Sequence, residues 1–216
     1  MPSGLRLAAV CILVAIAAYI AVSGCAMMGP KRAPISSLSD TLSVDARTDT
    51  LLAFAEKYPK DPGVFFALGN AYYDQAIPDD ARANYEKALS LDPKMVQAKV
   101  NLAMLTAESG FPDSALMELD QIVKQYPDNS MALTDLGLLY FNQKDYDTAV
   151  KYYTRAIAAD PKNPEAHYNL GVVFANKGLL LEALREWRIV LELTSEGDTA
   201  QRAQLGIERV EASLAK

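Results

Sequence analysis

Few residues of this 216-residue chain have the types and spacing that catalytic or metal chemistry requires. The sequence has two cysteines and one histidine, and it lacks the GxxxxGK, HExxH, CxxC and GxSxG motifs that hold phosphates, metals or an activated nucleophile. Twenty-seven acidic against 21 basic residues give a net charge of −6, which argues against binding that rests on neutralising nucleic-acid phosphates. We therefore expect a protein that is not an enzyme, holds no cofactor or metal, and binds no nucleic acid.

The two cysteines lie in and just after an apolar stretch near the N-terminus. Residues 7–22 carry no charge and follow Arg6, which is the layout of an export signal. Cys11 lies inside this stretch, and Cys25 follows it after two small residues. As a helix the stretch would span roughly 24 Å, less than a hydrocarbon core of about 30 Å. Length alone leaves open whether the segment is removed or stays as an anchor.

Residues 22–25, Val-Ser-Gly-Cys, resemble the bacterial lipobox, in which an aliphatic and two small residues precede the cysteine that receives diacylglycerol. The resemblance implies that residues 1–24 are a lipoprotein signal peptide and that Cys25 is the lipidated N-terminus of the mature chain. Ala26 follows the cysteine, and in this family a residue other than Asp there points to the outer membrane. The expected location is the periplasmic face of the outer membrane in a bacterial cell envelope. The alternative is an uncleaved transmembrane anchor beside a chance cysteine.

Glycine, proline and serine replace the apolar residues after the cysteine. Residues 25–47 show neither a helical nor a strand period, so we predict a lipidated N-terminus followed by a flexible tether. Twenty flexible residues have a root-mean-square reach of about 25 Å, which is enough to hold a folded domain clear of lipid head groups.

A pattern of apolar and small residues recurs every 34 residues from residue 62 onward. Positions 4, 7, 8 and 11 of each unit share one helical face, and positions 20, 24 and 27 share another, with a break between them. Gly110 and Gly178 fall in that break, where a positive φ is expected, and Pro78 and Pro112 fall in the first turn of the second helix. In the first unit the pattern comprises Phe65, Leu68, Gly69, Tyr72, Ala81, Tyr85, Ala88 and the closing Pro93.

This pattern resembles the tetratricopeptide repeat, a helix pair of 34 residues. The resemblance implies an all-α fold, a right-handed superhelical solenoid of helix-turn-helix repeats with terminal capping helices. Lys99 and Thr106 in the second unit and Ser195 in the fourth depart from the pattern, which puts local packing there in doubt. The predicted divisions are an N-terminal capping helix from a degenerate repeat at 48–61, repeats at 62–95, 96–129, 130–163 and 164–197, and a C-terminal capping helix at 198–216.

The C-terminal segment carries an amphipathic helical pattern. Ala203, Ile207, Val210 and Leu214 form an apolar stripe that we expect to cover the last repeat. A lipid-binding amphipathic helix is the alternative, although the mixed charges and small apolar residues of this segment favour a cap.

A second face of each first helix is left free by the core pattern. Positions 2, 5, 9 and 12 point away from positions 4, 7, 8 and 11, and in the resembling family they line a concave groove. The exposed aromatic, aliphatic and amide side chains predict a site for a peptide segment, with Asp135 and Asn169 alongside. The alternative is that a neighbouring repeat covers some of these positions. The predicted groove residues are Phe66, Asn70, Tyr73, Val100, Asn101, Met104, Thr134, Leu138, Phe141, Tyr168 and Val172.

Two other residues are conspicuous by type. His167 falls at position 4, where other units have Phe65 and Leu133, so we expect a packed, hydrogen-bonded histidine rather than a catalyst or ligand. Trp187 falls at position 24, the place of Tyr85, and is expected to pack as well.

Together these features predict a lipid-anchored envelope scaffold that holds a protein partner in its groove and sits on the membrane through its N-terminal lipid. The partner is expected to be a peptide segment or an envelope assembly component. Type IV pilus assembly lipoproteins and outer-membrane barrel-assembly lipoproteins are similar in architecture only. The alternatives are a repeat adaptor on an uncleaved anchor and, with no nucleophile or acid–base pair to nominate, an enzyme accessory.

Overall fold

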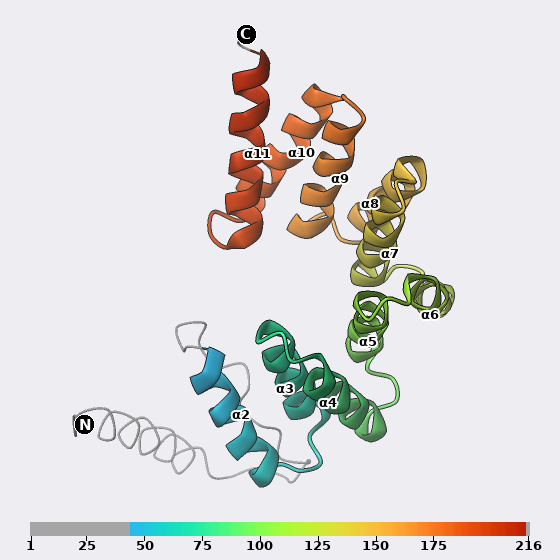
Figure 1. Ribbon diagram of the computed structural model, residues 1–216, viewed down its shortest axis with the longest axis vertical. Coiled ribbons are helices and arrows are strands. Elements are labelled where there is room, and N and C mark those ends of the chain that lie inside the picture. Colours follow the sequence, from blue (N-terminus) through green and yellow to red (C-terminus); the bar gives the residue numbers. More distant parts are fainter. Residues whose placement is uncertain (1–43, 215–216) are drawn as a thin grey trace, which may run out of the picture. The chain divides into compact units, whose positions relative to one another are not determined.

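The computed structural model describes residues 44–214, which form ten α-helices and no strand (Figure 1). The predicted all-α solenoid is confirmed. No helix within residues 44–214 is long and apolar enough to cross a membrane. The predicted signal peptide at 1–24, the lipidated Cys25 and most of the tether lie outside the described residues.

The helices follow one another along the chain as a single helix, four pairs and a final helix. Successive pairs begin 34 residues apart, and the two helices of each pair contact one another. The helices are α2 (Val44–Lys57), α3 (Pro62–Asp74), α4 (Pro78–Leu91), α5 (Val96–Glu108), α6 (Pro112–Gln125), α7 (Ser130–Asn142), α8 (Tyr146–Ala159), α9 (Pro164–Asn176), α10 (Leu180–Leu193) and α11 (Asp198–Leu214).

Each pair is closed by a small residue at position 8 of the first helix against a large side chain at position 24 of the second. A Cβ atom added to Gly137 would lie only 2.6 Å from the ring of Tyr153. The same close approach joins Gly69 to Tyr85 and Gly171 to Trp187. In the second unit a residue larger than glycine in the first helix faces one smaller than tyrosine in the second helix: Ala103 stands opposite Leu119, and both are fully buried.

Successive units meet mainly where the second helix of one unit contacts the first helix of the next, and some first helices also contact one another. Helix α5 contacts α7, α7 contacts α9, and α9 contacts α11, whereas no comparable contact joins one second helix to the next within residues 44–214. The first helices therefore line the inner side of the stack. Position 3 is buried in every unit and in α11, with Val64, Ala98, Ala132, Ala166 and Ala200.

Helix α11 continues this register as the first helix of a fifth unit, whose second helix is not among residues 44–214. Ala203, Ile207 and Val210 are buried as predicted, but Leu214 is 56% exposed. The prediction for Leu214 was wrong because α11 has 17 residues against 14 in α10, so its last turn has no helix to cover it.

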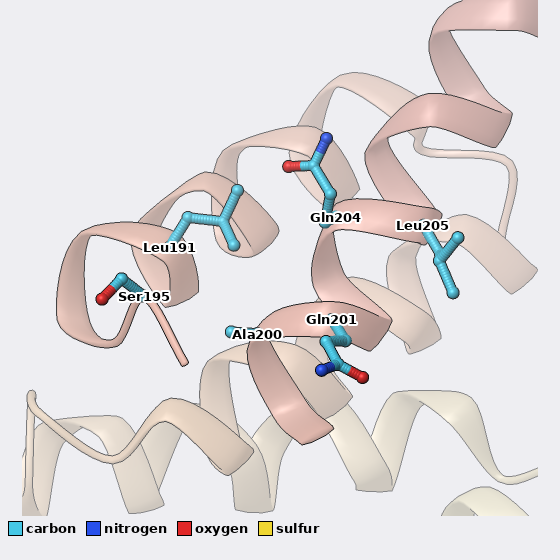
Figure 2. Close-up of a pocket in the computed structure, with 6 residues that line it drawn as sticks. All are labelled: Leu191, Ser195, Ala200, Gln201, Gln204 and Leu205. Carbon is cyan, nitrogen blue, oxygen red and sulfur yellow. The ribbon is translucent and has the colours of Figure 1, made fainter. Parts of the chain in front are cut away.

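The free face of α11 is largely polar. It borders a hollow of about 470 Å³ where α10 ends and α11 begins, lined by Leu191, Ser195, Ala200, Gln201, Gln204 and Leu205 (Figure 2). Two of these residues, Gln201 and Gln204, stand at positions 4 and 7, where another unit would present apolar side chains to its second helix. Within residues 44–214 no second helix covers this face.

At the other end, α2 serves as the second helix of an incomplete unit. Leu51 stands at position 24 and is 1% exposed, and Gln75 donates a hydrogen bond to the Thr48 hydroxyl at 2.6 Å. The helix begins at Val44, inside the stretch that we predicted to be tether. Asp45 in its first turn favours this earlier start because a carboxylate stabilises the positive end of the helix dipole.

The turns between paired helices place one residue in the left-handed region. Gly110 (φ 93°) and Gly178 (φ 76°) are the two predicted positions. Ala76 (φ 57°) and Lys144 (φ 64°) take the same conformation in the other two repeats, where a Cβ atom is strained.

We predict that Gly137→Ala lowers the free energy of unfolding by about 1–3 kcal/mol through overpacking against Tyr153, although alanine is the better helix former. Combining it with Tyr153→Leu recreates the Ala103–Leu119 pair. The double variant should therefore be more stable than the sum of the two single effects predicts, by about 1 kcal/mol or more in urea unfolding. Strictly additive effects would contradict the close contact.

We predict that Lys144→Gly raises the free energy of unfolding by about 0.5 kcal/mol. Removing the strained Cβ gains about 1–2 kcal/mol, and the extra freedom of glycine in the unfolded chain offsets part of that. Gly110→Ala should act in the opposite direction. The same urea titrations measure both, and a loss of stability in Lys144→Gly would show that its turn is not strained.

Candidate functional site

The inner face consists of the side chains at positions 2, 5, 6, 9 and 12 of α3, α5, α7 and α9, together with Glu108 at position 13 of α5. Among the predicted groove residues, Tyr73 is 41% exposed. Eight others are half-buried on this face: Phe66, Asn70, Asn101, Met104, Leu138, Phe141, Tyr168 and Val172. They can still meet a ligand because the core does not enclose them.

Two predicted groove residues do not belong to this surface. Val100 is completely buried and packs in the core with Leu133 and Leu136 of the next unit. Thr134 is 5% exposed, and its hydroxyl donates to the carbonyl of Ser130 and accepts from the side chain of Asn163 at 3.3 Å. Position 5 of the second and third units is therefore covered by the following repeat.

The junction between the first and second units carries a closed polar network. The Tyr85 hydroxyl donates to Oδ1 of Asn70 at 2.8 Å. Nδ2 of Asn101 donates to the same oxygen at 2.9 Å and to the Tyr85 hydroxyl at 3.0 Å. Burial raises the pKa of Tyr85 to about 12, so this hydroxyl stays protonated as a donor. The ring of Phe66 packs on the ring of Tyr85, with 5.8 Å between the two ring centres.

Tyr73 links the ends of α3 and α5. Its hydroxyl donates to Oε1 of Glu108 at 2.5 Å, and burial followed by this hydrogen bond raises the pKa of Tyr73 above its ordinary value. Both residues border a hollow of about 450 Å³ between the two units. The remaining lining residues are Ala76, Pro78, Leu105 and Ser109.

Asp135 stands at position 6 of the third unit, the place that Asn101 takes in the second unit. Protein surrounds its carboxyl on most sides, yet the side chain still reaches solvent through the inner face. Burial, with a smaller effect of the Glu165 charge, raises the pKa of Asp135 to about 7. No residue within 44–214 gives this carboxyl a hydrogen bond or an ion pair.

The inner face ends beside α11. The guanidinium of Arg202 lies 4.5 Å from the centre of the Tyr168 ring and pairs with Glu165 at 3.2 Å. A hollow of about 450 Å³ opens here between α9 and α11, with Tyr168, Val172 and Trp187 in its wall. The cation–π contact and the ion pair together order the aromatic side chain at this end.

The two residues expected to pack do so. His167 is 5% exposed, and its ring nitrogens lie 2.7 Å from Oε2 of Glu186 and 3.3 Å from the carbonyl of Pro161. Trp187 is also 5% exposed and donates through Nε1 to the carbonyl of Tyr168 at 3.1 Å. Both rings are held between helices rather than presented to a ligand.

The inner face presents a surface for binding. Within residues 44–214, no three His, Cys, Asp or Glu side chains are grouped so that they could hold a metal ion. What the inner face offers is aromatic and aliphatic surface, acidic groups and the amides of Asn70, Gln97, Asn101 and Asn169, which suit an extended peptide with apolar side chains. Sequence reasoning missed Glu108 because it lies at the end of α5, beyond the repeated positions. It missed Arg202, at position 5 of α11, because α11 was expected to be a cap rather than a further first helix.

Comparisons with known proteins agree with this architecture. A family model described as TPR repeat matches residues 115–178, and one described as tetratricopeptide repeat matches residues 73–136. Protein O-mannosyl-transferase Tmtc3 of Drosophila melanogaster is 34% identical over 121 residues, which cover 56% of this chain and 13% of that protein. Cellulose synthase operon protein C of Pseudomonas fluorescens (strain SBW25) is 31% identical over 147 residues, which cover 64% of this chain and 12% of that protein. The chain thus spans less than a fifth of the length of these relatives.

Solved structures share the fold. A thermophilic TPR protein of Thermus thermophilus matches with a TM-score of 0.67 at 20% identity, over 76% of this chain and 90% of that one. The crystal structure of MamA matches with a TM-score of 0.50 at 23% identity, over 69% of this chain and 88% of that one. With its 34-residue helix pairs and matching family models, the chain belongs to the tetratricopeptide repeat family, whose repeats form protein–protein interaction scaffolds.

Proposed function

We propose that this protein is a lipid-anchored scaffold of the bacterial cell envelope that holds a peptide segment of a partner protein on its inner face. The carrying observation is that Tyr73, Leu138 and Phe141 remain accessible on this face after the apolar positions of the repeats have been used in packing. Large apolar side chains that stay partly exposed along one face are typical of interaction sites.

The amide groups of the inner face complement this apolar surface. Asn70 and Asn101 bond one another through one oxygen and one nitrogen, which leaves the Asn101 oxygen and the Asn70 nitrogen available. A peptide backbone offers both a donor and an acceptor at every residue. The amides therefore suit an extended segment whose side chains pack against Phe141 and Tyr168.

The proposed membrane attachment rests on the sequence. Cys25 follows the apolar residues 7–22 after two small residues, as the lipobox requires. Attached acyl chains contribute about 0.8 kcal/mol for each buried methylene, so a doubly or triply acylated cysteine would give stable anchoring. Assembly of an envelope complex, of the type IV pilus or outer-membrane barrel kind, is the role that we propose for such an anchored scaffold.

We predict that radiolabelled palmitate is incorporated into the wild-type protein and lost completely in Cys25→Ser. The thioether bond to diacylglycerol cannot form without the sulfur atom. The mass of the mature N-terminus serves as the second measurement. Label retained in the variant, or an N-terminus that still carries residues 1–24, would instead favour an uncleaved anchor.

We predict that Tyr73→Ala/Phe141→Ala reduces crosslinking of the partner in cells by about tenfold or more, because truncating aromatic anchors removes the largest contributions to binding. Phe66 is left intact because its ring packs on Tyr85, whose hydroxyl belongs to the hydrogen-bond network with Asn70 and Asn101. Phe111→Ala/Met117→Ala is the matched control, since these side chains are 62% and 67% exposed outside the inner face. Equal crosslinking by both variants, at equal helical content by circular dichroism, would exclude the inner face.

A further inference from the structure

The three junctions between successive units present the same three positions with different chemistry. Position 9 of one unit, position 24 of the same unit and position 6 of the next unit meet on the inner face, as the hydrogen bonds among Asn70, Tyr85 and Asn101 show. At the third junction the corresponding residues are Leu138, Tyr153 and Asn169. At both of these junctions the residues at all three positions are uncharged.

The middle junction breaks this pattern. Asp135 stands at position 6, but the residues equivalent to Asn70 and Tyr85 are Met104 and Leu119, neither of which can donate a strong hydrogen bond. The neighbours of the Asp135 carboxyl group at this junction are therefore the thioether of Met104 and the alkyl side chain of Leu119. Burying a carboxylate without a partner costs several kcal/mol, and a ligand group that pairs with this acid would offset that cost.

The surroundings of Asp135 specify the charge of that group. The charged and titratable groups that face it are Glu165 of α9, paired with Arg202 of α11, Tyr153 of α8, and the Tyr73–Glu108 pair of α3 and α5. Positions 2, 5, 6, 9 and 12 of the four units contain no lysine or arginine. The inner face thus presents acidic groups to its ligand and offers Asp135 no cation of its own.

We propose that the partner segment carries a lysine or arginine whose cation pairs with the Asp135 carboxylate, with apolar side chains next to it packed against Leu138 and Phe141. This inference rests on the proposed peptide-binding function and adds the chemistry of the partner to it. Leu138 and Phe141 follow Asp135 at intervals of three residues, so the acid and the two apolar side chains form one row along α7. The long alkyl stem of a lysine or arginine packs beside Met104 while its charge reaches the acid.

Binding through Asp135 should depend on pH in a defined direction. With a pKa of about 7, the free carboxyl is ionised in about one tenth of molecules at pH 6 and about nine tenths at pH 8. A lysine or arginine of the ligand stays charged throughout this range. Since only the ionised acid pairs with the cation, affinity should rise about tenfold from pH 6 to pH 8.

The experiment selects ligands from a library of random ten-residue peptides displayed on phage, using the full-length protein as bait. Wild type is compared with Asp135→Asn, which places at position 6 the residue that Asn101 and Asn169 already provide there. Glu118→Gln, which removes an exposed carboxylate of α6, is the matched charge control. Tyr73→Ala/Phe141→Ala tests the inner face itself. Fluorescence anisotropy then measures one selected peptide and its Lys→Gln or Arg→Gln counterpart at pH 6 and pH 8.

Wild type and Glu118→Gln should enrich peptides with a basic residue beside apolar residues, and Asp135→Asn should lose the basic preference. The selected peptide should bind wild type about tenfold more tightly at pH 8, with no such change for Asp135→Asn or the glutamine peptide. Unchanged basic selection by Asp135→Asn, or selection of peptides without a basic residue by wild type, would overturn this inference alone. Peptides that bind Tyr73→Ala/Phe141→Ala as tightly as wild type, or no selected peptide, would overturn the proposed function too.

Discussion

The contact between position 8 and position 24 is the constraint on which the rest of the structure depends. A glycine in the first helix lets a tyrosine or tryptophan ring of the second lie directly on its backbone, at distances that no Cβ atom permits. That approach fixes how each pair closes, and with it the direction of every other side chain on the first helix. The Ala103–Leu119 pair shows that the constraint is one of shared volume rather than of glycine itself.

Because the pairs close in the same way, the inner face repeats its geometry at every junction while its chemistry changes. One junction closes its polar groups among Asn70, Tyr85 and Asn101. The next replaces two of the three with apolar residues and retains an acid at Asp135. Stable repeats thus allow single side chains to set local binding chemistry, since the surrounding backbone does not depend on them.

Sequence periodicity predicted the helices well because it reports contacts inside one repeat. The turn glycines, the starting prolines and the packed roles of His167 and Trp187 all followed from position within the 34-residue unit. It did not predict that Val100 and Thr134 are buried. The following repeat buries both of these side chains. The angle at which neighbouring repeats pack gives no periodic signal in the sequence. For the same reason, the sequence could not predict the burial of Asp135, which raises the pKa of its carboxyl group.

The polar face of α11 has a consequence for the size of what can bind. Gln201 and Gln204 stand where other units present apolar residues to their second helices, so this face of α11 offers less apolar surface to a further helix. Four first helices with axes about 10 Å apart then give a track of about 30–40 Å. An extended chain rises about 3.3 Å per residue, so the proposed site on these four helices has room for a stretch of roughly ten residues.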